Sequence, residues 1–360
     1  MKIVFLNHFI SGGGAERVTC LLAGKMAENG LDVTMMTDLF RPFAYHVNDN
    51  VKRLPLFITK KQAGSHVYFL YMVRNVRRMI KKIRPDVIIG VLPVMNMVAV
   101  IAARGTKTKV IASHHTSFDR PVGIHIRFIQ TFGYRLADAV TVLTQADYNY
   151  LGKKLPQKVV MPNPLAYPCV EGADYSRKKN ILAVGRLDVW DVKGFDLLIQ
   201  AWAKISQDFP EWTLEIAGGG KEESQKELQR LVEDAHVGNQ VRFLGFRNDI
   251  DAVMRESSIF VLSSRIEGFG MVLVEAMSQG CACISFDDGG RQREIIRSDK
   301  EGIIISNHSD NDLAEAIRKL ITNQKERMDM ASQAISRASD FSLDKIEQKW
   351  ESLIDIVCKS

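Results

Sequence analysis

The stretch Ile259–Met277, which reads IFVLSSRIEGFGMVLVEAM, decides the fold class. Its first four residues are all apolar, which is typical of a buried strand. The apolar spacing of its second half predicts a helix that begins near Met271. The loop between them places Glu267 at the carboxyl end of the strand and Glu275 about one turn inside the helix. Apolar strands that run into helices favour a parallel sheet covered on both faces.

The same alternation extends outward over the whole chain. The other strands expected from apolar runs are 2–6, 32–37, 86–91, 109–113, 139–143, 180–184, 213–217, 241–244, 282–286 and 302–305. Between 143 and 180 the prolines Pro162, Pro164 and Pro168 disfavour helix and mark a linker. We therefore expect an α/β protein with two doubly wound domains, 1–165 and 166–340, followed by an amphipathic helix within 341–360.

Length and composition exclude several classes of protein. The 360 residues are too many for one ordinary core, and 46% hydrophobic with 25% charged residues is typical of a globular enzyme. The first apolar run already carries Asn7 and His8 and lacks a cleavage site, so we expect a cytoplasmic location. The five cysteines have no metal-binding spacing, which predicts reduced thiols.

The net charge of +6 is divided unevenly. Residues 1–165 contain 23 Lys and Arg against 9 Asp and Glu, whereas residues 166–360 contain 25 against 33. A basic first half and an acidic second half predict two domains with different partners.

Two glycine-containing loops are candidates for anion binding. Gly12–Arg17 (GGGAER) joins the first strand to the first helix, where backbone N–H groups favour an anion. Arg186 and Lys193 flank a loop after strand 180–184, where open α/β sheets bind ligands, and two cations suit a diphosphate. Taken singly, the first loop is equally typical of a tight turn without a ligand, and the second of two surface cations.

Together, these motifs resemble those of the GT-B glycosyltransferases of the large retaining family 4. The resemblance extends over essentially the whole chain. The motifs that carry it are GGAER at 13–17, NP in the linker, GRL and KG around Arg186 and Lys193, the glycine turn 218–220, VRFLG at 241–245, and the pair Glu267 and Glu275 in EGFG and VEA.

The resemblance implies a GT-B fold, with two Rossmann-like domains facing a central cleft and a C-terminal helix that crosses back to the first domain. It implies transfer of a hexosyl or N-acetylhexosaminyl group from a nucleotide sugar, by preference a UDP-sugar, to a lipid-linked saccharide in capsule, lipopolysaccharide or other surface polysaccharide synthesis. A GDP-mannose-dependent mannosyltransferase is one alternative, and a basic protein that binds nucleic acid or membranes without catalysis is the alternative from another class. A GT-B epimerase or phosphorylase is a closer rival, but the glycine-rich first turn and EGFG favour the transferase.

The family pattern also assigns roles to residues. Arg186 and Lys193 would hold the donor diphosphate, Glu267 the hydroxyls of the donor sugar, and Glu275 the ribose. The remaining contacts it implies are the backbone of Gly268, Phe269 and Gly270 at the donor sugar, Gly13 and Gly14 at the donor phosphates, and His115, or its neighbour His114, near the reacting centre.

One loop departs from the family pattern, because Asp287–Arg293 stands where many relatives have a proline-glycine turn. We expect this loop to influence donor preference. The two D-x-D sequences, Asp249–Asp251 and Asp310–Asp312, precede helix-like segments and are interpreted as acids at helix N-termini. We therefore expect no metal and no other cofactor, and a same-face reaction in which the leaving phosphate accepts the proton of the acceptor.

A basic amphipathic segment lies at 66–84. From Thr59 to Arg84 the chain has no acidic residue, and the apolar positions fall on one helical face. The basic residues we assign to an anionic membrane surface and a lipid-linked acceptor are Lys60, Lys61, Arg74, Arg77, Arg78, Lys81 and Lys82. The alternative is an ordinary core-packed helix. We expect a peripheral protein at the inner face of the membrane and no nucleic-acid partner, since no reader motif is present. The oligomeric state has no signal in the sequence.

Overall fold

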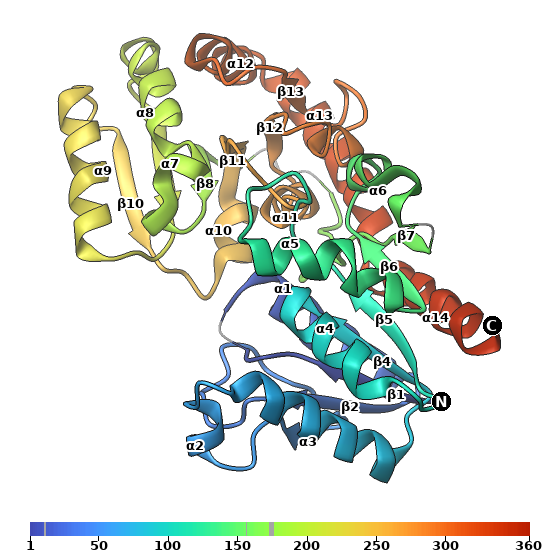
Figure 1. Ribbon diagram of the computed structural model, residues 1–360. Helices are drawn as coiled ribbons and strands as arrows, with labels where there is room; N and C mark the ends of the chain where they lie inside the picture. Colours follow the sequence, from blue (N-terminus) through green and yellow to red (C-terminus); the bar gives the residue numbers. More distant parts are fainter. Residues whose placement is uncertain (11, 156, 173–175) are drawn as a thin grey trace. The chain divides into compact units, whose positions relative to one another are not determined.

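The computed structural model describes residues 1–10, 12–155, 157–172 and 176–360, and they form two compact units. Unit 1 comprises Met1–Ala166 together with Leu343–Ser360, and unit 2 comprises Tyr167–Ser342. The predicted domain boundaries lie within two residues of these divisions, and the first division falls inside the proline-rich linker. Figure 1 shows the chain by sequence position, with the last helix returning to the unit that contains the N-terminus.

Unit 1 is built on a parallel sheet, whose strand order is β3-β2-β1-β4-β5-β6-β7 among the described residues. The strands are β1 (Lys2–Leu6), β2 (Asp32–Thr37), β3 (Lys52–Pro55), β4 (Val87–Val91), β5 (Lys109–Ser113), β6 (Ala139–Val142) and β7 (Lys158–Val160). The central strands β4 and β6 are buried throughout and β5 is buried after its first residue, as their apolar runs predicted. The edge strands β3 and β7 were not predicted.

Two layers of helices cover this sheet. The helices are α1 (Gly14–Glu28), α2 (Lys60–Ala63), α3 (Tyr68–Ile83), α4 (Leu92–Ala103), α5 (Ile124–Thr131), α6 (Gln145–Leu151) and α14 (Leu343–Lys359). The strand order reverses at β1, so right-handed crossovers place α1 on one face and the α3, α4 and α5 connections on the other. Consistently, α1 packs against α14, whereas α4 packs against both α3 and α5 (Figure 1).

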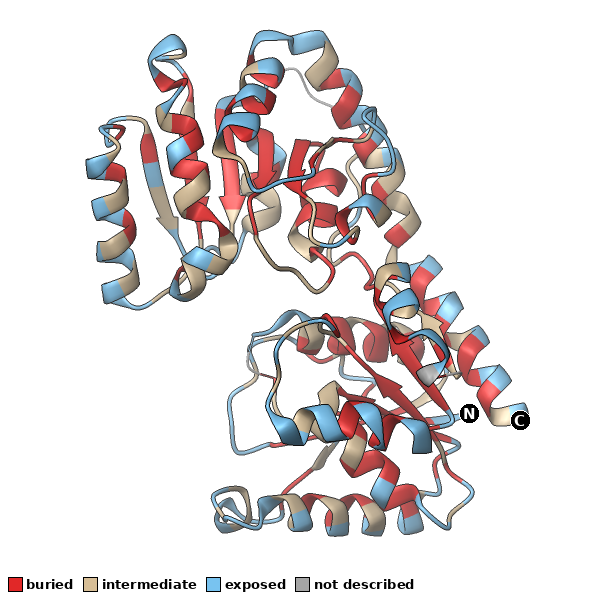
Figure 2. Ribbon diagram, turned by 45° about the horizontal axis from the view of Figure 1, so that its top comes forward, coloured by how far each residue is buried: buried red, intermediate tan, exposed pale blue. Residues whose placement is uncertain are grey.

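Unit 2 has the order β10-β9-β8-β11-β12-β13, again with every described pair of strands parallel. Its strands are β8 (Lys178–Val184), β9 (Thr213–Ala217), β10 (Val241–Gly245), β11 (Ser257–Leu262), β12 (Ala282–Phe286) and β13 (Ile303–Ile305). Its helices are α7 (Trp190–Lys193), α8 (Phe195–Ala203), α9 (Glu222–Asp234), α10 (Ile250–Glu256), α11 (Met271–Ser278), α12 (Asp310–Thr322) and α13 (Gln324–Ala338). In both units the central strands are the most deeply buried elements, whereas the edge strands β3 and β10 are partly exposed (Figure 2). The expected α/β class with two Rossmann-like domains is therefore correct.

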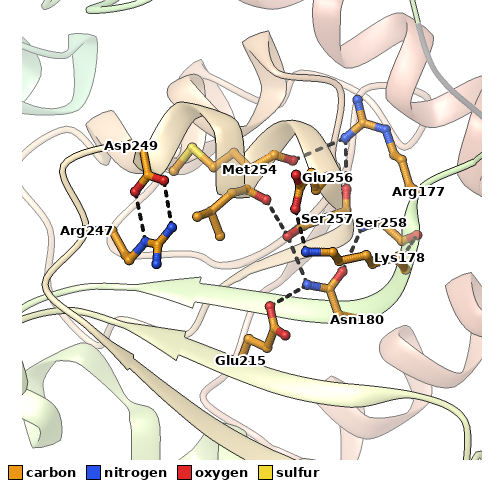
Figure 3. A network of polar contacts seen from close by, with 11 residues as sticks. Arg177, Lys178, Asn180, Glu215, Arg247, Asp249, Met254, Glu256, Ser257 and Ser258 are labelled. Carbon is orange, nitrogen blue, oxygen red and sulfur yellow. Dashed lines mark hydrogen bonds and ion pairs between the residues drawn. The ribbon is translucent and has the colours of Figure 1, made fainter.

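A polar network ties the amino-terminal edge of the unit 2 sheet together (Figure 3). Arg177 donates to the backbone carbonyls of Met254 and Ser257, at the end of α10, and to that of Gln279, just after α11. Asn180, on β8, donates to the buried Glu215 at 2.8 Å. Because these contacts hold α10, α11 and β8 at this edge, the loops at the opposite, carboxyl edge project from a fixed base.

The amphipathic segment 66–84 forms α3, but its apolar face is not free. Met72, Val76, Met79 and Ile80 are buried in the core of unit 1. The interpretation of this apolar face as a membrane contact is therefore wrong, because the sheet and α4 already cover it. Most of its basic residues face solvent, together with Tyr68 and Leu70 in its first turn.

Candidate active site

Four loops gather at the carboxyl edge of the unit 2 sheet, because the carboxyl ends of parallel strands meet at one edge. They follow β8, β9, β11 and β12, and they span 185–194, 218–220, 263–270 and 287–293. All predicted donor-binding side chains lie on two of them or on α11. This edge is therefore the candidate donor site.

Glycines allow these loops to touch through their backbones. A Cβ at Gly218 would lie 1.8 Å from the carbonyl oxygen of Gly185, and one at Gly194 would lie 1.9 Å from that of Ser263. Gly194 also has φ of +65°, which side-chain-bearing residues rarely adopt. The glycines of this edge therefore bring the loop 185–194 against both neighbouring loops.

Lys193 and Glu267 form the central pair of the site. The Lys193 ammonium lies 2.6 Å from a carboxylate oxygen of Glu267, and both side chains are mostly buried. The two residues are 74 positions apart in sequence. The residue predicted to hold the diphosphate, Lys193, and the residue predicted to hold the sugar, Glu267, are thus in direct contact.

Arg265 joins the two loops that carry this pair. Its guanidinium forms two hydrogen bonds of 2.7 Å with the Asp196 carboxylate and a third to the carbonyl of Asp191. Its backbone N–H donates to the carbonyl of Val192 at 2.8 Å. No motif gave Arg265 or Asp196 a role; the only signal in the sequence was two opposite charges, each two residues away from the motifs KG and EGFG.

The loop 287–293, where the chain departs from the family pattern, reaches the site. The Asp288 carboxylate accepts the backbone N–H of Glu267 at 2.7 Å, and the N–H of Asp288 is bound by Gln292. Arg291 is buried and lies 3.7 Å from the Asp288 carboxylate, while Arg293 pairs with Asp287 at 2.7 Å. This loop therefore supports the backbone of Glu267.

The segment after Glu267 turns into α11. Phe269 is buried, and its ring packs edge-on against Phe341. The ring is therefore part of the core of unit 2, and only the backbone of Phe269 is left for contact with a ligand. Gly270 caps the helix with φ of +91°. Glu275 is buried in α11. These positions are compatible with the predicted backbone contacts of 268–270.

Arg186 differs from the other predicted ligands. It is exposed, and among the described residues we find no hydrogen bond or ion pair of its guanidinium. An exposed guanidinium at the carboxyl end of β8 can bind an anion without first breaking a protein contact.

In unit 1 the two histidines after β5 have different environments. His114 is buried, and its ring nitrogens lie 2.9 Å from the Tyr134 hydroxyl and 3.0 Å from that of Thr116. Burial lowers its pKa to about 3. His115 is less buried and contacts Ser113 at 2.9 Å; burial lowers its pKa to about 4, partly offset by a hydrogen bond with Asn163. The geometry thus makes His114 structural and favours His115 as the candidate.

Gly13 caps α1 and Gly14 is its first residue; both are exposed. The Glu16 carboxylate folds back over this helix end, since a Cβ at Gly13 would lie 2.3 Å from it. Burial raises the pKa of Glu16, and hydrogen bonds from the backbone of Gly13 and Glu16 oppose that rise. A carboxyl group of the chain itself therefore lies at the helix terminus predicted to approach phosphates.

The remaining predicted residues are placed as follows. Lys60, Lys61, Arg74, Arg78, Lys81 and Lys82 are exposed, and Arg77 instead donates to the carbonyls of Ala102 and Arg104. Of the two D-x-D sequences, Asp249 forms two hydrogen bonds with Arg247, and Asp310 pairs with Lys204. Asp310 and Asp312 lie in the first turn of α12, which Ser309 caps.

Comparison with known proteins identifies both halves of the chain. Residues 12–165 match the family model described as Glycosyltransferase Family 4, and residues 171–337 match that of Glycosyl transferases group 1. The division between the matched regions coincides with the linker between the two units.

Similar proteins match over nearly their full lengths. The amylovoran biosynthesis glycosyltransferase AmsD of Erwinia amylovora is 26% identical over 98% of this chain and 99% of its own. An α-1,4-N-acetyl-D-galactosaminyltransferase of Campylobacter jejuni, named for a diphospho-undecaprenol-linked acceptor, is 25% identical over 98% of each chain.

Among solved structures, HepE of Anabaena in complex with UDP superposes with a TM-score of 0.82 at 21% identity, covering 99% of this chain and 100% of HepE. That likeness concerns the fold. With family models matching both units, the chain is a glycosyltransferase with the GT-B fold.

Proposed function

We propose that the chain is a retaining, metal-independent hexosyltransferase. It moves a hexosyl or N-acetylhexosaminyl group from a UDP-sugar to a hydroxyl of a lipid-linked saccharide in surface polysaccharide synthesis. The observation that carries this proposal is the pairing of Lys193 with Glu267 beside the exposed Arg186, at the carboxyl edge of the unit 2 sheet. This pairing places two cationic side chains and a carboxylate that can accept hydrogen bonds from hydroxyl groups on neighbouring loops.

The chemistry follows from the charges. Cleavage of the glycosidic bond leaves negative charge on the nucleotide diphosphate, which Lys193 and Arg186 stabilise. When the diphosphate binds, Lys193 exchanges its bond to Glu267 for one to phosphate. The Glu267 carboxylate then accepts hydrogen bonds from the hydroxyl groups of the donor sugar. The backbone N–H of Glu267 keeps its hydrogen bond to the Asp288 carboxylate. We assign proton transfer from the acceptor hydroxyl to the leaving phosphate on the same face of the sugar.

Metal independence is supported by the partners of the acidic residues. Asp249 and Asp310 already bind cationic side chains of the protein. Lys193 and Arg186 supply the positive charge that a metal ion brings to a diphosphate in other transferases.

The acceptor is proposed from the relatives and from the charge of unit 1. Relatives in Campylobacter jejuni are named for lipid diphosphate-linked saccharides. Unit 1 presents an exposed basic row on α2 and α3 that suits an anionic membrane surface. Among the described residues, no helix combines the length and the apolar character needed to cross a bilayer. We place the enzyme at the cytoplasmic face of the membrane.

The test is calorimetric titration of UDP, GDP and ADP into the protein with a chelator present. We expect UDP to bind most tightly without metal, and Arg186→Ala to weaken that binding. Tightest binding of GDP would support the mannosyltransferase alternative. Binding of UDP only after Mg²⁺ or Mn²⁺ is added would contradict metal independence. Product analysis with the matching nucleotide sugars then gives the sugar and the anomeric configuration.

A further inference from the structure

Helix α5 and the short helical turn that follows it expose a row of large apolar side chains. Ile124, Phe128, Phe132 and Leu136 are 88%, 54%, 53% and 55% exposed. Ile124 and Phe128 lie four residues apart on α5 and share one side of it, and Phe132 and Leu136 continue at the same spacing through the helical turn that follows. The rings of Phe128 and Phe132 are in contact, with centroids 5.1 Å apart. We call these four residues the α5 stripe.

The stripe is not the core side of this segment. Ile129 and Tyr134 are buried in the core of unit 1 and hold the segment to the sheet. The stripe therefore lies on the outward side of a helix that is already anchored. Soluble proteins rarely expose a contiguous row of this kind without a partner that covers it.

The surrounding layer of helices carries positive charge only. Helices α3, α4 and α5 lie side by side on one face of the unit 1 sheet (Figure 1). Neither these helices nor the turn Gly133–Leu136 contain Asp or Glu. Arg127 and Arg135 are exposed within the segment that carries the stripe.

The topology gathers further cations at one end of this layer. Each of these helices runs from the carboxyl end of one strand toward the amino end of the next, so their C-termini meet at one edge of the sheet. Exposed there are Lys81 and Lys82 of α3, and Arg104 and Lys107 after α4. A surface pocket beside Leu136 is lined by Arg104, Lys107 and Lys109, the last paired with Asp138 at 3.3 Å.

The opposite face of the same sheet serves as an internal comparison. There α1 and α14 mix both signs of charge, with Glu16, Lys25 and Glu28 on α1 and Lys345, Glu347, Glu351 and Asp355 on α14. The absence of acidic residues therefore distinguishes α3, α4, α5 and the turn after α5 from α1 and α14.

We infer that the α5 stripe is the part of unit 1 that enters an anionic lipid surface. The apolar side chains provide contact with the acyl region, and the surrounding Arg and Lys residues bind the anionic headgroups. The inference rests on the proposed lipid-linked acceptor, and it moves the apolar contact from α3, whose apolar face is buried, to α5. The basic residues of α3 then contribute charge.

The test is sedimentation with vesicles that are either neutral or contain anionic phospholipid, in low salt and in about 1 M salt, where the Debye length is only about 3 Å. The variant is Phe128→Ala together with Phe132→Ala. Its matched control is Phe246→Ala in unit 2, since Phe246 is 75% exposed. Arg78→Gln with Lys82→Gln removes charge from α3 without touching the stripe.

We expect wild type and Phe246→Ala to bind anionic vesicles more tightly than neutral ones and to keep part of that binding in high salt. The phenylalanine variant should lose at least tenfold in affinity in high salt, the order expected for two apolar side chains that stay in water. The α3 variant should lose affinity in low salt only.

Unchanged vesicle binding of the phenylalanine variant in high salt would overturn the inference. Absence of vesicle binding by the wild-type protein would also overturn it. A wild-type dimer in sedimentation velocity that the phenylalanine variant abolishes would instead assign the stripe to a second copy of the chain. Titration of UDP into each variant tests folding and the donor site separately, so failure of the proposed transferase function would be seen independently of vesicle binding.

Discussion

The Lys193 side chain is mostly buried, and its partner is one that the proposed diphosphate would replace. Its ammonium pairs with Glu267 at 2.6 Å, and the carbonyl oxygen of the same residue accepts the hydroxyl of Ser263. A single residue thus connects the stability of the loop, through its backbone, with the proposed stabilisation of the leaving diphosphate, through its side chain.

We predict that Lys193→Ala lowers turnover by at least about 10²-fold, the scale of one lost group that stabilises a developing charge. The measurement is steady-state transfer from the preferred nucleotide sugar. Lys179→Ala is the control, because Lys179 is exposed and pairs with Glu211 away from the site. A folded Lys193→Ala protein with near-normal turnover would contradict the assigned role.

His114 makes the stability of unit 1 depend on pH. Burial lowers its pKa to about 3, whereas an unfolded chain has a histidine pKa near 6.5. Between these values the unfolded state binds more protons than the folded state. The contribution is therefore complete above about pH 6.5 and is lost as the pH falls toward 3.

We predict that the free energy of unfolding of unit 1 falls as the pH is lowered from 6.5 to 4.5. The slope from His114 alone is at most about 1.4 kcal/mol per pH unit. Hydrogen exchange of the β5 amides reports it. His114→Gln keeps polar atoms at the site but cannot titrate there, so its slope should be shallower by that amount. Equal slopes in both proteins would show that His114 is not the titrating group.

At the residue scale, the sequence could predict which side chains belong to the candidate site, but it could not predict the contacts between them. Matching motifs selected Lys193 and Glu267, yet their ion pair joins residues 74 positions apart and depends on the packing of two loops. The choice between His114 and His115 was open in the sequence because both follow the same strand. It depends on which ring points into the core, against Phe118 and Tyr134.

Among the elements, the loops 185–194 and 263–270 behave as one body because of Arg265. The guanidinium fork on Asp196 is a geometry that lysine cannot reproduce. Since the fork is only partly exposed, its effect should be on the position of the loops more than on overall stability.

We predict that Arg265→Lys raises the KM for the nucleotide sugar by about tenfold, the effect of roughly 1.4 kcal/mol, and changes kcat less. Asp196→Asn should have a similar effect, and the double variant should be little worse than either single one. Lys204→Ala is the control, because it breaks another ion pair of unit 2, with Asp310, that does not touch these loops. Additive effects of the two substitutions would contradict a shared contact.

The elements that sequence predicted well are those with continuous apolar runs, such as β5 and β12. Strand β3 (Lys52–Pro55) was missed because it is a short edge strand with two charged residues and a proline. Periodicity alone could not assign α3, since an apolar face looks the same whether it packs on a sheet or on a membrane. The sequence did contain a signal for the α5 stripe, because its apolar residues recur at every fourth position. Other apolar residues of the same segment are buried, so the sequence alone could not tell which of them are exposed.

At the scale of the whole molecule, unit 1 is completed by a helix from the far end of the chain. Ile346 and Ile354 of α14 are fully buried, and Trp350 is nearly so. Lys25 of α1 pairs with Asp344 at the start of α14. Unit 2 is thus inserted between two parts of unit 1.

We predict that Ile354→Ala lowers the free energy of unfolding of unit 1 by about 2–5 kcal/mol. Ile356→Ala, on the exposed side of the same helix, should change it by less than about 0.5 kcal/mol. Unfolding followed by hydrogen exchange assigns the change to a unit. UDP binding should persist in Ile354→Ala, because the candidate donor residues Arg186, Lys193 and Glu275 belong to unit 2. Destabilisation of unit 2 as well would show that the two units unfold together.

The return of α14 also determines when unit 1 can finish folding during synthesis. The ribosome has made all seven strands of its sheet by Val160, yet the helix that covers Lys25 and its neighbours emerges only after the whole of unit 2. Until then the face of α1 that α14 will cover is open to water and to chaperones. A polypeptide truncated after unit 2 is complete at Ser342 but before α14 would therefore contain the candidate donor-binding unit beside an incomplete unit 1, with the α14-facing side of α1 uncovered.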